Sequence, residues 1–267
     1  MIARRLVAAL SLVFAVHANP AIAGQGCSEK PLTTATLQSA MSAVQRVTAE
    51  LDKRGVQVAV LGRIGQDLSK YGLRYSHVGF VYREGPDQPW RIAHLLNDCG
   101  SNRSDLWYEG VGNFFLDDLF AYDAVVMVPP PELSQRLLSR LSDAKALRSL
   151  HDPDYSLVAY PFSTRYENSN TWVLETIVVS SAKDAVIHSR SEAKAWLKMT
   201  GYRPSELEIG AFNRLGGRMF KANVAFDDHP NDLRYSGRIR TVTADSIEQF
   251  VKSRNEGWSV FEIAAKP

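Results

Sequence analysis

The fold of this chain is decided around one short stretch, Tyr75-Ser76-His77-Val78-Gly79-Phe80-Val81. The residues that follow the histidine are mostly apolar or β-branched, which is typical of a buried β-strand. A similar run covers residues 90–96, and the turn-forming residues 85–87 lie between the two. Together they predict an antiparallel hairpin that carries His77 near the start of its first strand and His94 inside its second.

Further elements are predicted on both sides of this hairpin. The spacing of apolar residues predicts helices over residues 34–54, 132–150, 169–180, 191–200, 205–226 and 244–254. Short apolar runs predict strands over residues 56–61, 123–128, 237–242 and 258–264. Strands that cluster in hairpins and mix with helices indicate an α+β fold, and we expect one domain over residues 24–267.

The N-terminus has the order of features of a secretory signal peptide over residues 1–23. Arg4 and Arg5 precede an apolar run over residues 6–16, and small residues up to Ala23 form a cleavage site. The run is shorter than the ~20 residues that a membrane-spanning helix needs, and Pro20 disfavours the alternative of a buried N-terminal helix. We therefore expect a periplasmic or secreted protein, cleaved near Ala23, that is not an integral membrane protein.

The composition argues against nucleic acid as a partner and suggests no cofactor. The chain has 31 basic and 29 acidic residues, so removing Arg4 and Arg5 leaves 31 − 2 = 29 basic residues and formal neutrality, without a basic stripe. His151, His188 and His229 show no metal-ligand spacing. The sequence thus predicts neither a metal site nor a bound cofactor.

The two cysteines of the chain, Cys27 and Cys99, form an even pair in a protein expected outside the cytoplasm. In an oxidising compartment such a pair first indicates a disulfide. A catalytic thiol is the alternative. It is weaker because neither cysteine lies at a helix start beside a positive group that would stabilise a thiolate. A Cys27–Cys99 disulfide would join the N-terminus of the mature chain to the body of the domain.

The start of the predicted helix at Ser169 is a place where chemistry could occur. Asn168 is a favoured N-cap residue, and a helix N-terminus offers free N–H groups and partial positive charge that stabilise a nearby anion. His77 could accept a proton from a nucleophile there, and His94 could orient His77. Taken alone, each signal also fits a structural histidine or an ordinary helix-start serine.

These motifs resemble those of the circularly permuted papain-like proteins, which include the permuted NlpC/P60 hydrolases and the lecithin:retinol acyltransferase family. The resemblance spans about residues 60–180 and rests on these segments: Ser76-His77-Val78-Gly79, the glycine-containing lead over 62–69, Asn168-Ser169 and Trp172-Val173. It implies a papain-like core of antiparallel strands over about 56–182 with a helix that carries the nucleophile position. A helical C-terminal extension over about 185–267 would follow. The whole chain also resembles DUF2145, an uncharacterised family of exported bacterial proteins.

The papain-like resemblance also implies roles for individual residues. Ser169 occupies the nucleophile position, His77 becomes the general base and His94 the orienting residue, with Asn97 and Asp98 as alternatives if the strand register differs. The implied reaction is hydrolysis or acyl transfer on an amide or ester, in a peptidoglycan peptide or a lipid acyl group, through an acyl-enzyme.

The sequence departs from the papain-like pattern at the nucleophile, where Ser169 stands in place of cysteine. A thiol, with an unperturbed pKa of about 8.5, ionises readily beside a histidine, whereas a serine hydroxyl must lose its proton during the attack itself. A native serine, an inactive relative and an engineered Cys→Ser change remain open. The alternative to an enzyme is a catalytically inactive binding module on the same fold, and a third possibility is an exported α+β protein without chemistry.

Overall fold

The structure is a computed structural model that describes residues 31–117, 119–182, 186–210 and 222–265. Its main sheet consists of β1 (Val58–Ile64), β2 (His77–Tyr82), β3 (Arg91–Asn97), β4 (Ser104–Gly110), β5 (Ala121–Val128) and β8 (Ser259–Ile263). Neighbouring strands are antiparallel, in the order β4-β3-β2-β1-β5-β8. A second, two-stranded sheet pairs β6 (Ser205–Glu208) with β7 (Arg238–Thr241).

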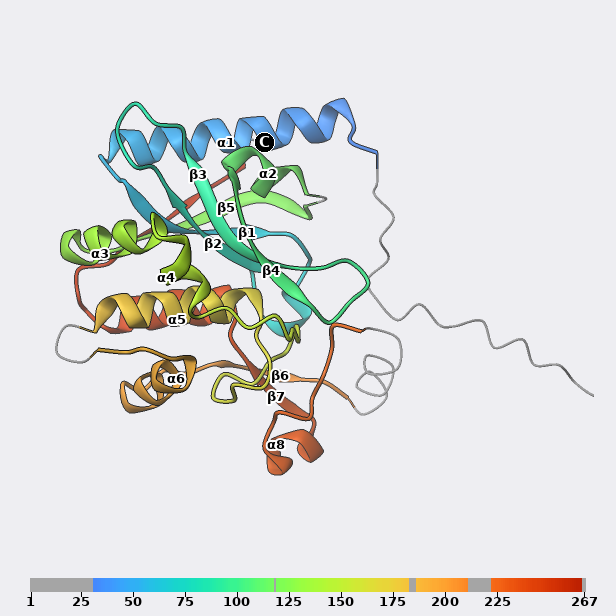
Figure 1. Cartoon of the computed structure of the whole chain (residues 1–267). Coiled ribbons are helices and arrows are strands. Elements are labelled where there is room, and N and C mark those ends of the chain that lie inside the picture. The colour runs from blue at the N-terminus through green and yellow to red at the C-terminus, as the bar shows by residue number, and fades with distance from the viewer. Residues whose placement is uncertain (1–30, 118, 183–185, 211–221, 266–267) are drawn as a thin grey trace, which may run out of the picture.

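Helices pack on both faces of the main sheet, as Figure 1 shows. They are α1 (Thr34–Lys53), α2 (Val111–Leu116), α3 (Pro131–Leu141), α4 (Ala144–Arg148), α5 (Ser169–Ser181), α6 (Arg190–Met199), α8 (Asn231–Ser236) and α9 (Ala244–Ser253). A short 3-10 turn spans Ser69–Tyr71. The α+β architecture expected from the sequence is therefore confirmed. Within the described ranges, no helix combines the length and hydrophobicity that a membrane span needs.

The two faces of the sheet bury different sets of side chains, because successive residues of a strand point in opposite directions. On what we call the α5 face, Val78 and Phe80 pack with α5, and the Phe80 and Trp172 rings meet edge-on at 5.7 Å between centroids. On the opposite α2 face, Leu61 and Val81 pack with α1 and α2. The alternation along β2 places the side chain of His77 on the α2 face.

α5 is the most deeply buried helix and has no solvent-facing side. Eleven of its 13 residues are buried, including the large apolar residue Trp172 and the charged residue Glu175. The sheet covers one side of α5, while α3, α6 and α9 contribute to the same apolar cluster from other directions. This environment explains why the sequence of α5 lacks the polar stripe of a surface helix.

Several predicted elements agree with the structure, while others need correction. The predicted helix over 132–150 is wrong as a single element, because Asp143 interrupts it and caps α4 by accepting N–H bonds from Lys145 and Ala146 at 2.9 and 3.1 Å. The predicted helix over 205–226 is wrong at its start, where residues 205–208 form β6. Its register places Glu206 opposite Arg240, with which it forms an ion pair.

The C-terminal extension is therefore not simply helical. β8 completes the edge of the main sheet beside β5, and β6 and β7 form the second sheet. β4 and α2 were not predicted as elements. The predicted signal peptide and Cys27 lie outside the described residues, so both the export signal and the Cys27–Cys99 disulfide stay predictions.

A buried group of charges attaches α6 to α5 and to the segment that precedes α5. Glu175 pairs with Lys194 at 2.6 Å and with Arg190 at 3.1 Å. Arg190 also pairs with Asp152 at 2.9 Å and lies 3.6 Å from Glu167. Three carboxyl groups thus face two cations. The pKa of Glu167 is raised to about 8, above all by burial and also by the nearby Glu175, while Arg190 opposes the rise.

The excess carboxyl group makes stability depend on pH. The pKa of Glu167 rises from an ordinary 4.5 to about 8 in the folded protein, so the folded state binds the extra proton between these values. Stability should therefore fall as pH rises through this window, by at most about 1.4 kcal/mol per pH unit. Glu167→Gln should flatten the profile of Tm against pH between 5 and 9, whereas the exposed control Glu84→Gln should not. Equal slopes for wild type and Glu167→Gln would contradict this account.

Candidate active site

The pairing of β2 with β3 ends just before the histidines. They pair from Phe80 to Tyr82, whereas β3 continues to pair with β4 along its whole length. Beyond this pairing, α5 supplies a hydrogen-bond partner, because the Val78 N–H donates to Asn170 Oδ1 at 3.1 Å. The first turn of α5 is thereby joined to the start of β2, one residue after His77.

Two asparagines hold the start of α5 in place. Asn168 caps the helix by accepting the Thr171 N–H at 2.8 Å, and its amide nitrogen donates to Thr241 Oγ1 at 2.9 Å. Both Asn168 and Asn170 also donate to the Val242 carbonyl, at 3.3 and 3.4 Å. The segment between β7 and α9 therefore helps to position the helix start, which connects the C-terminal region to the candidate site.

A buried chain of hydrogen bonds runs across the α2 face through His77, His94 and Glu109. His77 Nε2 lies 3.0 Å from His94 Nδ1, and His94 Nε2 lies 2.8 Å from Glu109 Oε1. The other carboxylate oxygen of Glu109 accepts a bond from Asn113 Nδ2 at 2.6 Å. The two imidazoles are only 9 % and 2 % exposed.

The order of donors and acceptors sets the tautomer of each ring. Glu109 as a carboxylate can only accept, so His94 Nε2 carries the proton of that bond and, in a neutral ring, His94 Nδ1 is the acceptor. His77 Nε2 must then donate, which leaves His77 Nδ1 unprotonated. Burial is the main cause that lowers the pKa of His77 well below 6.5, with Arg63 and His94 adding to it. Burial also lowers the pKa of His94, although Glu109 opposes this effect.

Gly79 allows the two histidines to approach each other. A Cβ atom at position 79 would lie 2.9 Å from His94 Cβ and 3.0 Å from the Ala93 carbonyl. Extension of the Phe80–Ala93 register places His94 opposite Gly79, on the same face as His77 and diagonal to it. Glycine is therefore required here by close packing.

A second charged group lies beside the histidines. Arg63, opposite His77 in the β1–β2 pairing, is 5 % exposed. It donates to the Phe114 carbonyl and, at 2.7 Å, to Asp117 Oδ2. The Phe114 ring covers both imidazoles, with centroid separations of 5.6 Å to His77 and 5.5 Å to His94.

The structure brings together two of the three predicted catalytic residues, His77 and His94. Ser169 begins α5 on the other side of the sheet, is 8 % exposed, and hydrogen-bonds to the buried Tyr155, whose pKa burial raises. None of the hydrogen bonds described for Ser169 and His77 joins the two side chains. They are linked through the backbone, because Asn170 follows Ser169 and bonds to Val78.

Of the alternative orienting residues, Asn97 is the last residue of β3 and Asp98 begins the turn that follows it. Asn97 donates to the carbonyls of Ser101 and Arg103 at 3.0 and 2.7 Å, and the Asp98 N–H bonds to the Arg103 carbonyl. These contacts hold the β3–β4 connection. Glu109 instead orients His94, which sequence reasoning missed because β4 had not been recognised as a strand next to β3.

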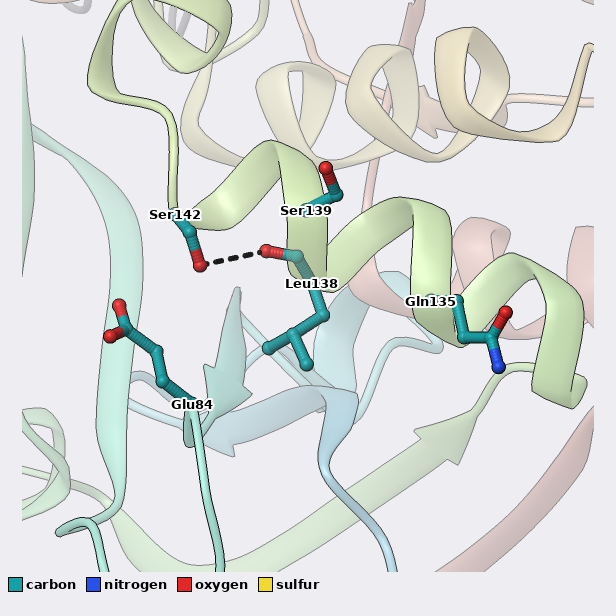
Figure 2. A pocket seen from close by; sticks show the side chains of 5 residues that line it. All are labelled: Glu84, Gln135, Leu138, Ser139 and Ser142. Carbon is teal, nitrogen blue, oxygen red and sulfur yellow. Dashed lines mark hydrogen bonds between the residues drawn. The ribbon is translucent and has the colours of Figure 1, made fainter.

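None of these residues lines the surface hollow whose lining side chains Figure 2 shows. It has a volume of about 330 Å³ and is lined by Glu84, Gln135, Leu138, Ser139 and Ser142. Its polar groups do not converge on one point, and Ser142 Oγ donates to the Leu138 carbonyl at 3.1 Å. The part of the chain that the structure describes also contains no group of three His, Cys, Asp or Glu residues able to hold a metal ion.

A family model described as an uncharacterised protein conserved in bacteria, DUF2145, matches residues 50–251. The chain belongs to this family. The match includes both histidines, Glu109 and the start of α5, and it extends through the β7–α9 segment that contacts Asn168. No curated protein and no solved structure matches the chain.

The contact between Gly79 and His94 can be tested by adding one methyl group. Gly79→Ala should destabilise the protein by about 1–3 kcal/mol, the usual range for overpacking a buried site, as measured by urea denaturation. Gly85→Ala is the matched control, because its new Cβ would meet only the Gln88 side chain at 3.7 Å. Equal stabilities of the two variants would contradict the close approach.

Proposed function

We propose that this protein is an exported hydrolase or acyltransferase with a papain-like arrangement, which acts on an amide or ester through an acyl-enzyme at Ser169. The observation that carries the proposal is the hydrogen-bond chain from Glu109 through His94 to His77. This chain ends in an unprotonated nitrogen on the strand to which the start of α5 is hydrogen-bonded. A buried acid–imidazole–imidazole chain is a means of preparing a general base.

The proposed reaction has two steps. Ser169 Oγ attacks the substrate carbonyl carbon while its proton passes to His77 Nδ1, and the same proton then goes to the leaving amine or alcohol as the acyl–nitrogen or acyl–oxygen bond breaks. Water, or an acceptor amine or alcohol, next attacks the acyl carbon and gives its proton to His77, which returns it to Ser169 Oγ as the ester bond between the acyl group and Ser169 breaks and the product leaves. His94 and Glu109 stabilise the transient imidazolium, and N–H groups at the start of α5 stabilise the oxyanion.

The protonation state of His77 favours a native serine as the nucleophile. A thiolate–imidazolium pair needs a protonated histidine, but burial and Arg63 lower the pKa of His77 and keep the ring neutral. A neutral imidazole is the form that accepts a proton from a serine hydroxyl. The environment of His77 therefore supports an active enzyme with Ser169.

In the conformation described, the candidate nucleophile is in a resting position. Its hydroxyl contacts Tyr155 on the α5 face, whereas His77 lies against Phe114 on the α2 face, so reaction requires the start of α5 and the start of β2 to rearrange until Ser169 and His77 meet. The same contact favours the second candidate function, an inactive binding module in which Ser169 serves only to begin α5.

A fluorophosphonate probe distinguishes these two functions. Ser169 should displace fluoride and form an oxygen–phosphorus bond, and His77→Ala should slow this labelling by about 100-fold or more, in the range of general-base catalysis. Labelling should already be at its maximal rate at pH 7, because the pKa of His77 lies below 6.5. Mass spectrometry of the labelled peptide identifies the residue.

Two variants complete this test. Ser169→Ala should abolish the labelling, whereas Ser180→Ala, which removes another buried hydroxyl of α5, should leave it unchanged. A folded protein that is not labelled, or labelling that is indifferent to His77→Ala, would favour the binding module.

A further inference from the structure

We propose that the groove between α1 and β8 binds an extended, acidic segment of a partner protein, which pairs with β8 as an added strand and places a carboxylate on Arg46. The inference is independent of the reaction proposed for Ser169. The groove lies at the β8 edge of the main sheet, whereas the start of α5 is joined to β2, with β1 and β5 in between.

The two edge strands of the main sheet are protected to different extents. On β4, the Ser104 N–H donates to the Pro153 carbonyl at 3.0 Å, and the Leu106 N–H donates to Asp105 Oδ1 at 2.8 Å. β8 pairs with β5 on one side, and within the part of the chain that the structure describes, residues 259–263 make no backbone hydrogen bond on the other side. An open edge is a template for another strand, so β8 offers the backbone groups that an extended peptide needs.

A groove with a volume of about 450 Å³ lies between α1 and β8. Such a volume is in the usual range for binding pockets. A peptide that pairs with an edge strand obtains affinity from main-chain hydrogen bonds and specificity from its alternate side chains. Those alternate side chains would face α1. The groove is lined from α1 by Arg46, Ala49, Glu50, Lys53 and Arg54, and from β8 by Phe261, Glu262 and Ile263.

Both carboxylates of the groove are already paired with cations of the protein. Glu50 pairs with Arg54 at 2.6 Å and with Lys53 at 3.7 Å. Glu262 pairs with Arg74 at 2.6 Å. Neither carboxylate is therefore left to neutralise a further cation of the groove.

Arg46 is the cation of the groove that lacks a carboxylate partner among the described residues. Its Nη1 donates to Ser42 Oγ at 2.8 Å, and its Nε is buried without an acceptor. A guanidinium forms its strongest hydrogen bonds with a carboxylate, whose two oxygens match its planar fork. The charge of the groove therefore favours an acidic partner.

The lining of the groove also determines the pattern of the partner. Ala49, Phe261 and Ile263 present apolar surface beside Arg46, so the added strand should alternate apolar and acidic side chains on the face toward α1. The β8 strand of a second copy does not have this pattern. Its Glu262 alternates with Phe261 and Ile263 and therefore points to the other face of the sheet.

Two blocked model peptides test this site in the intact protein. Acetyl-Thr-Val-Thr-Glu-Thr-Val-Thr-amide places two valines and one glutamate on the same face, and its analogue with glutamine in place of glutamate differs only in charge. By fluorescence anisotropy, the glutamate peptide should bind about tenfold more tightly, as expected for one hydrogen-bonded charge pair. Hydrogen exchange should show slower exchange of backbone amides within residues 259–263 when the peptide is bound.

A variant of Arg46 and a matched control locate the carboxylate. Arg46→Gln should remove the preference for the glutamate peptide, whereas Arg91→Gln, which removes an exposed positive charge from β3, should keep it. Absence of saturable binding, equal affinities of the two peptides for the wild type, or a preference that persists in Arg46→Gln would overturn the proposal. Sedimentation that shows a dimer without peptide, with residues 259–263 protected in it, would assign the edge to a second copy and also overturn it.

Discussion

The burial of α5 on all sides is the constraint on which the rest of the structure depends. A helix without a solvent face must be covered by the sheet on one side and by later segments on the others, so the chain after α5 returns as α6 and α9. Its buried Glu175 requires the cations Arg190 and Lys194. Its N-terminus, also buried, requires partners from the chain, which Asn168 and Asn170 obtain from β2 and from the β7–α9 segment.

The same constraint determines what the candidate site can do. α5 approaches the start of β2 from one face, while His77, His94 and Glu109 occupy the other, and the hydrogen bond from the Val78 N–H to Asn170 joins the helix start to the strand that carries His77. The conformation described keeps these groups apart, with Ser169 held by Tyr155 and His77 beneath Phe114.

Local sequence patterns predicted the hairpin, the long first helix, the start of α5 and the meeting of His77 with His94. These features depend on neighbouring residues or on a short connection. Glu109 and Arg63 could not be assigned in this way, because their positions depend on the pairing of β4 with β3 and on packing against α2. Residues 205–208 were misassigned for a similar reason, since their strand character comes from pairing with residues 238–241, far along the chain. The side chain of His77 points away from α5 because it lies on the α2 face of the sheet. The alternation of side chains along β2 could have predicted this direction.

The most direct test of the account is the protonation of the imidazole nitrogens in the folded protein. Two-dimensional NMR that correlates ring protons with ¹⁵N nuclei at pH 7 distinguishes the protonated from the unprotonated nitrogen of each histidine. The account predicts neutral rings in which His77 carries its proton on Nε2 and His94 carries its proton on Nε2. A proton on His77 Nδ1 would leave that nitrogen unable to accept a proton, and a doubly protonated His77 would leave no base in the ring. Either result would contradict the proposed role of this hydrogen-bond chain.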